Sequence, residues 1–233
     1  MAHYFVFPEK DTTIFSHPTE QSLNTGLDEI LTLRDSESTT DLNHYPSRIL
    51  LQFKTKEWGD VINNIAPNKN VITASLKLYQ TEHRELAGIQ HIEVYPLAES
   101  WINGTGRLAN SPQITNGCSW KFRDGTDNRF SNTIGTSWNT GSSDGTFPDF
   151  RTASFIDDAK GGGLWWVNGD TQGTGFEATK SINFNEDLDL NINITAPLLK
   201  QYAFEFESAG TPSGIPNNGF ILKRSESQEF TTR

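Results

Sequence analysis

The sequence has a single cysteine, Cys118, so no disulfide can form within the chain. Cysteine scarcity of this kind is typical of proteins made in a reducing cytosol. No apolar run approaches the ~20 residues that span a bilayer. The start of the chain, "MAHYFVFPEKD", lacks the basic segment and the long apolar stretch of a signal peptide. We therefore expect cytoplasmic synthesis and no membrane partner.

Positive charge is also scarce, because 19 Lys and Arg residues face 29 Asp and Glu residues, giving a net charge of −10. Such a surface repels phosphate backbones and argues against a nucleic-acid partner. Hydrophobic residues reach only 34%, yet aromatic residues make up 11%. Each large ring can bury ~150–250 Å². We therefore expect a packed core in a single domain covering residues 1–233.

Apolar and polar residues alternate with a period of two in several segments, and turn-rich segments separate them. This pattern is typical of strands with one wet face. It predicts an all-β fold, an antiparallel β-sandwich of jelly-roll type. The expected strands are residues 28–35, 47–55, 71–80, 91–97, 188–194, 202–208 and 218–224.

One segment, "TKEWGDVINNIAP", has helical spacing instead. Trp58, Val61, Ile62 and Ile65 follow each other at i, i+3, i+4 and i+7. This spacing predicts one short amphipathic helix, capped near Thr55 and ending before the following proline. We expect its apolar stripe, with Trp58 as a structural anchor, to cover one end of the sandwich.

Residues 103–175 differ in texture from the rest of the chain, since they are rich in Gly, Asn, Ser and Thr. They still carry several large rings, which a flexible linker would not contain. We expect a long, ordered loop excursion, and loops of this kind often carry function. The rings are Trp138, Phe147, Phe150, Trp165 and Trp166.

The stretch "PLAESWINGTGRL" allows three interpretations: a ligand site, a nucleotide loop or the end of a strand. Residues 104–109 satisfy the glycine pattern of dinucleotide loops. That chemistry needs a following helix and a parallel sheet, and "NSPQITNG" does not predict a helix. A structural turn formed by Gly104 and Gly106 is therefore favoured.

Metal and catalytic motifs are also weak. Asp187, Asp189 and Asn191 begin like a calcium loop, but the required Gly and Glu are missing. The five histidines lack zinc spacing, and Cys118 has no activating base nearby in sequence. We expect no cofactor, no metal and no catalytic residue.

Two weaker options stay open. Loop oxygens of Asp124, Asp127 or Asp144 suit a calcium ion, although solvated turn aspartates are the favoured explanation. Paired carboxylates, either Glu93 with Glu99 or those at 157–158, would be needed for glycoside hydrolysis, but sequence does not give their separation.

The order of three segments resembles the DNRLRE-type β-sandwich domain. "SRILLQFKT", "VITASLKLYQTE" and "IEVYPLAESWINGTGR" contain its elements at Arg48–Phe53, Ala74–Tyr79 and Trp101–Thr105. The continuation is similar to a variant found in tailed phages, including T4-like phages of marine bacteria such as cyanophages. The resemblance covers about Asp11 to Glu229.

This resemblance implies a non-enzymatic virion protein of a tail, baseplate, fibre or capsid surface, made in the host cytoplasm. It also implies that Trp101 and the Gly-Thr-Gly turn are structural anchors. Partners would be other virion proteins or further copies of the chain. The alternative is a carbohydrate-binding module, with aromatic rings stacked on a host surface glycan.

Assembly contacts are expected at exposed rings of the excursion and of the C-terminal segment. The family pattern usually closes with a further strand after "ILK", whereas the sequence given ends at "EFTTR", so either the sheet ends early or a C-terminal part is missing. We expect an exposed edge near Phe220–Lys223 that pairs with a neighbouring chain. The expected contact residues are Trp138, Phe147, Phe150, Trp165, Trp166, Phe220 and Phe230.

Overall fold

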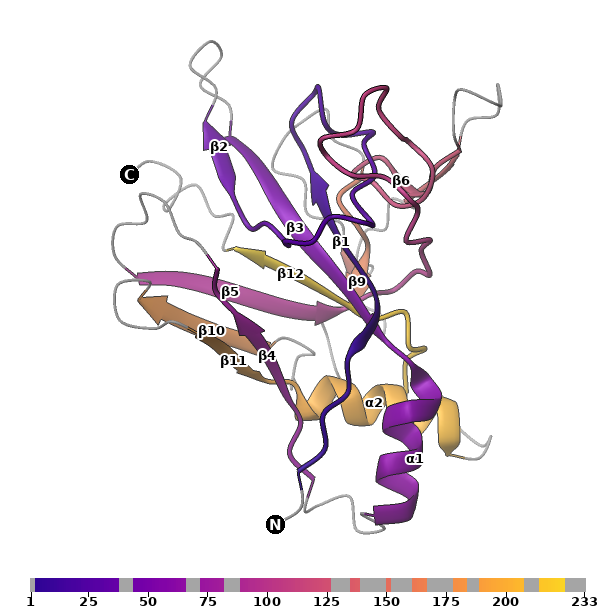
Figure 1. The fold of residues 1–233 in the computed structure, drawn as a ribbon. Coiled ribbons are helices and arrows are strands. Elements are labelled where there is room, and N and C mark those ends of the chain that lie inside the picture. Colours follow the sequence, from indigo (N-terminus) through magenta and orange to yellow (C-terminus); the bar gives the residue numbers. More distant parts are fainter. Residues whose placement is uncertain are drawn as a thin grey trace.

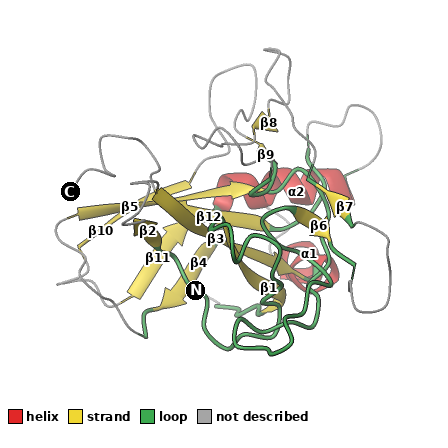
Figure 2. Ribbon diagram, turned by 90° about the horizontal axis from the view of Figure 1, so that it is seen from above, coloured by secondary structure: helices red, strands yellow, loops and turns green. Residues whose placement is uncertain are grey.

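The computed structural model shows a mostly β protein with antiparallel sheets and two helices among the residues it describes (Figure 2). The fold class is therefore confirmed at the level of antiparallel β structure, and the sandwich or jelly-roll arrangement stays a prediction. The described residues are 3–37, 44–65, 72–81, 89–126, 135–138, 150–151, 161–166, 178–183, 189–207 and 214–224.

A six-stranded sheet forms the centre of the fold (Figure 1). Its strands are β1 (Pro8–Phe15), β2 (Asp35–Glu37), β3 (His44–Phe53), β5 (Ile89–Pro96), β10 (Ala178–Asn183) and β12 (Phe220–Arg224). The order is β1-β3-β12-β5-β10, with β2 beside β3, and every pair is antiparallel. The strand that comes last in sequence thus lies in the middle of the sheet.

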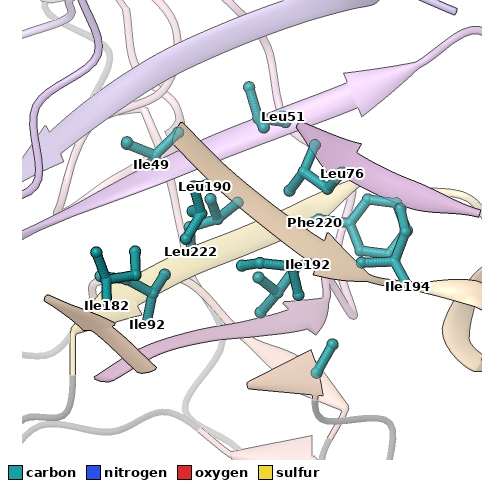
Figure 3. Close-up of a cluster of buried hydrophobic side chains, with 12 residues drawn as sticks. Ile49, Leu51, Leu76, Ile92, Ile182, Leu190, Ile192, Ile194, Phe220 and Leu222 are labelled. Carbon is teal, nitrogen blue, oxygen red and sulfur yellow. The ribbon is translucent and has the colours of Figure 1, made fainter. Parts of the chain in front are cut away.

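A second, two-stranded sheet covers one face of the main sheet. It consists of β4 (Ser75–Tyr79) and β11 (Asp189–Asn193). Leu76 on β4 pairs in register with Ile192 on β11, and both side chains lie in one buried cluster with Ile49 and Leu222 of the main sheet (Figure 3). The alternating pattern of the sequence therefore places one face of each short strand in this core and leaves the other wet.

The central strands β3 and β12 are apolar on both faces. Leu51 and Leu222 belong to the cluster under the second sheet, whereas Leu50 and Ile221 belong to a cluster on the opposite face. All four side chains are at most 1% exposed. Consecutive apolar residues, as in "ILL" and "FIL", are what a strand buried on both faces requires.

Two helices lie side by side at one end of the sheet (Figure 1). The first, α1 (Thr55–Ile65), confirms the expected helix, and Trp58 and Ile62 on its apolar stripe are buried against Tyr202. The second, α2 (Thr195–Phe206), was not expected. The Phe206 ring of α2 packs on α1 at Gly59. A Cβ added to Gly59 would lie only 2.1 Å from the nearest atom of this ring, so the contact requires glycine.

The expected strand at 202–208 is wrong, because residues up to Phe206 are helical. Tyr202 and Phe206 are spaced at i and i+4 as well as fitting a period of two, so short alternation alone does not distinguish the two structures. The helical spacing continues upstream to Leu198, which also packs in this cluster. Pro197 sits in the first turn, where a proline is tolerated.

Two further expectations need correction. The strand expected at 28–35 is absent: within that range only Asp35 belongs to a strand, β2. Leu31 and Leu33 instead pack from a loop onto the core. The expected exposed edge at Phe220–Lys223 is also wrong, because β12 pairs with β3 on one side and β5 on the other.

The remaining described parts of the loop excursion contain short strands. They are β6 (Phe122–Asp124), β7 (Thr136–Ser137), β8 (Phe150–Arg151) and β9 (Trp165–Trp166). They pair as β6 with β7 and β8 with β9. The strands β1 and β10, at the two edges of the main sheet, had no counterpart among the expected strands.

Candidate functional site

The face of the main sheet opposite the second sheet is covered by a layer of tryptophans from the loop excursion and the turn before it. We call this the tryptophan layer, and it consists of Trp101, Trp120, Trp138 and Trp165. These rings are 1–3% exposed and pack on Ile14, Leu50 and Ile221 of the sheet. The excursion is therefore held in place by its own rings, at least in the parts that the structure describes.

Several residues that were expected to make assembly contacts are buried inside the chain. Trp138, Trp165 and Phe220 are at most 3% exposed, and their burial within the chain corrects the expectation that they make surface contacts. Trp166 is half-buried, and Phe150 pairs with it across β8 and β9. The other two expected contacts, Phe147 and Phe230, lie outside the described residues.

A buried cation lies inside the tryptophan layer. Arg48 on β3 is 1% exposed, and its guanidinium carbon lies 4.4 Å from the Trp120 ring centre and 5.2 Å from that of Trp165. Its Nη1 donates a hydrogen bond of 2.5 Å to the carbonyl of Gly162. Cation–π contacts of this kind are strongest where water is excluded, so Arg48 ties the excursion to the sheet.

The glycines at 161–163 permit this close contact. All three have positive φ, which residues with a Cβ rarely adopt. A Cβ on Gly162 would lie 2.3 Å from Nη1 of Arg48, and one on Gly161 would lie 2.1 Å from the Trp120 carbonyl oxygen. The "GGG" run therefore serves packing around Arg48.

The stretch "INGTG" is held by a single buried side chain, Asn24. Its Nδ2 donates to the carbonyls of Asn103 (2.7 Å) and Cys118 (2.8 Å). Its Oδ1 accepts from the backbone N–H groups of Gly26 and Gly106. A Cβ on Gly106 would lie 2.3 Å from the Asn24 carbonyl oxygen. Of the three interpretations, the structure shows a structural turn.

Trp101 directly precedes the "INGTG" turn in the sequence. The Trp101 indole, 1% exposed, donates to the carbonyl of Asn218 at 3.0 Å. Gly104 has a φ of +78° and no room for a Cβ beside Asn24. Glu99, the carboxylate of the same stretch, lies half-exposed beside this turn.

A polar row lies on the same face of the sheet, beyond the tryptophan layer. Lys223 on β12 pairs with Glu93 on β5 and lies 5.8 Å from the Tyr95 ring centre. Two residues before Glu93 on β5, His91 lies opposite Ser181 of β10. The Ser181 hydroxyl and Nδ1 of His91 form a hydrogen bond of 2.9 Å. Because Glu93 is bound in an ion pair with Lys223, it is not a free acid for glycoside hydrolysis.

Metal-ligating and nucleophilic groups give no further site among the described residues. No group of three His, Cys, Asp or Glu side chains there could hold a metal ion. Asp124 lies on β6, while Asp127, Asp144 and residues 157–158 lie outside the described ranges. Burial raises the pKa of the Cys118 thiol well above its ordinary value, which suppresses the reactive thiolate.

Three exposed aromatic side chains lie close together in a segment that the sequence had not singled out. We call residues His3–Phe7 the N-terminal arm. Tyr4, Phe5 and Phe7 are 53%, 71% and 75% exposed, whereas Val6 packs on the Trp58 cluster. The alternation of Phe5, Val6 and Phe7 was present in the sequence, but only the structure shows that the outward side is uncovered.

Neither described helix has the length and apolar character needed to cross a membrane. No protein-family model, no curated protein and no solved structure matches this chain.

Proposed function

We propose that the chain is a structural component of a bacteriophage particle and acts through protein–protein contacts. The order of motifs that resembles the DNRLRE-type domain supports the class of protein. The covering of the central strands on both faces supports a rigid scaffold. Its site of action would be the virion, after synthesis in the host cytoplasm.

The observation that carries the proposal is the exposure of the N-terminal arm. Large exposed apolar groups that lie together mark protein–protein contact sites. Phe5 and Phe7 leave nearly three quarters of their surface uncovered, although the chain buries its tryptophans efficiently elsewhere. We therefore propose that the N-terminal arm makes the assembly contacts, in place of the buried rings of the excursion.

The carbohydrate-binding alternative needs a row of exposed rings beside amides or carboxylates. The four rings of the tryptophan layer are at most 3% exposed, and the exposed rings of the arm lie in "HYFVF", which contains no amide or carboxylate side chain. The assembly proposal is therefore preferred.

Sedimentation of particles from a producing culture, followed by peptide mass spectrometry, tests the proposal. We expect the chain to sediment with intact particles at a fixed ratio to the major capsid protein. Recovery of the chain only as free protein at the top of the gradient would contradict it. Glycan-array binding of the isolated chain would then be the next measurement.

A further inference from the structure

The N-terminal arm belongs to no helix or strand among the described residues. His3–Phe7 leads directly into the edge strand β1, which begins at Pro8. Among the described residues, the arm makes no backbone hydrogen bond with any other segment. Unpaired N–H and C=O groups on an extended segment are a template for pairing with another strand.

We propose that the arm pairs with the arm of a second copy of this chain, as two antiparallel strands related by a two-fold axis. This inference rests on the proposed function and names the partner. A two-fold contact uses the same surface on both copies. The arm suits this role because "HYFVF" carries no Asp, Glu, Lys or Arg, so two chains of net charge −10 meet without acidic groups directly opposite each other.

The axis is placed at Phe5 by the side-chain alternation. With Phe5 opposite Phe5 of the second copy, Phe7 lies opposite His3, and Val6 lies opposite Tyr4. Rings that face each other across antiparallel strands stabilise the pair. The inward side, where Val6 contacts the cluster of Trp58, would receive Tyr4 of the second copy.

The exposed area determines how strong this contact is. At the ~150–250 Å² that each ring presents, the three rings at 53%, 71% and 75% exposure leave about 400 Å² per copy. Even if pairing covered all of this area on both copies, only about 800 Å² would be buried, below the ~1,200–2,000 Å² of a stable, specific interface. The pair is therefore weak by itself, and many copies held in one particle would make it collectively strong.

Disulfide trapping tests the register directly. In a Phe5→Cys variant, paired arms hold two thiols at the ~4.5–5.5 Å Cβ separation of directly opposed residues, close to the ~3.5–4.5 Å that a disulfide needs. The buried Cys118 stays out of the reaction. The matched control is Tyr79→Cys, because Tyr79 on β4 is 74% exposed and lies outside the arm.

We expect the Phe5→Cys variant, treated with oxidised glutathione, to form dimers at least roughly tenfold faster than Tyr79→Cys, owing to the high effective concentration of paired thiols. Sedimentation equilibrium of the unmodified chain should show association with a dissociation constant on the order of 0.1 mM. A Phe5→Ser, Phe7→Ser double variant should remain monomeric, and Tyr79→Ser should associate normally. Equal crosslinking of the two cysteine variants overturns the inference.

Particle sedimentation separates this inference from the proposed function. If the chain sediments with particles but the two cysteine variants crosslink equally, the arm does not pair with itself and the structural role stands. If the arms crosslink but the chain is absent from particles, self-pairing stands and the proposed function fails.

Discussion

The guanidinium carbon of Arg48 lies 4.4 Å from the centre of the Trp120 ring, with both residues 1% exposed. This pair joins strand β3 to the loop excursion across 72 positions of the sequence. A buried cation that loses its partners retains the cost of its desolvation. The contact therefore stabilises the tryptophan layer only if its full geometry is kept.

Arg48→Lys is expected to lower the free energy of unfolding by about 2–3 kcal/mol, because lysine lacks the planar stack on Trp120 and the reach to Gly162. Urea denaturation followed by tryptophan fluorescence measures the change. Arg107→Lys is the control, since Arg107 is 47% exposed and pairs with an exposed Glu29, and it should change stability by under ~0.5 kcal/mol. Equal effects of the two substitutions would contradict the role of Arg48.

Gly162→Ala and Gly163→Ala separate backbone strain from collision. Both positions have positive φ, which costs an L-residue roughly 1–2 kcal/mol. The new Cβ at 162 would also meet Arg48 at 2.3 Å, whereas at 163 its nearest neighbour is the flexible end of Ile221 at 2.9 Å. We expect Gly162→Ala to be the more destabilising, by a further ~1–3 kcal/mol in a urea titration. The reverse order would show that Arg48 moves aside freely.

Asn24→Asp tests the side chain that holds the "INGTG" turn. The substitution replaces the Nδ2 donor with a carboxylate oxygen facing the carbonyls of Asn103 and Cys118. Unsatisfied and repelling buried groups should cost about 3–5 kcal/mol, measured as the loss of unfolding free energy. The control is Asn110→Asp, because the side-chain Oδ1 of Asn110 accepts a hydrogen bond from the Arg107 N–H at an exposed position, and a carboxylate oxygen can accept the same bond. A small effect at Asn24 would mean that the turn is held by other contacts.

The raised pKa of Cys118 predicts a loss of stability at alkaline pH. The thiol ionises in the unfolded chain above about pH 8.5, but burial keeps it protonated in the folded chain. Its contribution is therefore complete below pH 8.5 and is lost as the pH rises, by ~1.4 kcal/mol per pH unit.

Cys118→Ala provides the comparison, since all other titrating groups are shared. The difference in unfolding free energy between the original chain and this variant should be constant from pH 6.5 to 8 and fall by about 2 kcal/mol by pH 10. A difference that stays constant to pH 10 would show that the folded thiol ionises normally.

Several strands could be predicted from the sequence because their side chains carry the necessary period, but the partly buried edge strands β1 and β10 were not expected. As expected, strands contain the segments around Leu50, Leu76, Val94 and Ile192. Trp58 lies in a helix, which was also expected. The signal for these elements is either local alternation or, around Leu50, a continuous apolar run, and a short window of sequence contains both.

The contacts that define the candidate site could not be predicted in the same way. Asn24 binds a turn 82 positions away at Gly106, and Arg48 binds Gly162 across 114 positions. Neither partner has a local pattern that reveals the other. The exposure of Phe5 depends equally on what the rest of the chain leaves uncovered, which no periodicity contains.

The central position of β12 also constrains when the protein can fold. Strands β3 and β5 do not pair with each other, and each is joined to the sheet's middle only through Phe220–Arg224. During translation, the ribosome therefore releases two largely apolar strands long before their shared neighbour is made. Loop closure over such separations is slow, and exposed strand edges aggregate. The central sheet therefore cannot be completed until β12 emerges, and until then the edges of β3 and β5 that β12 covers stay unpaired.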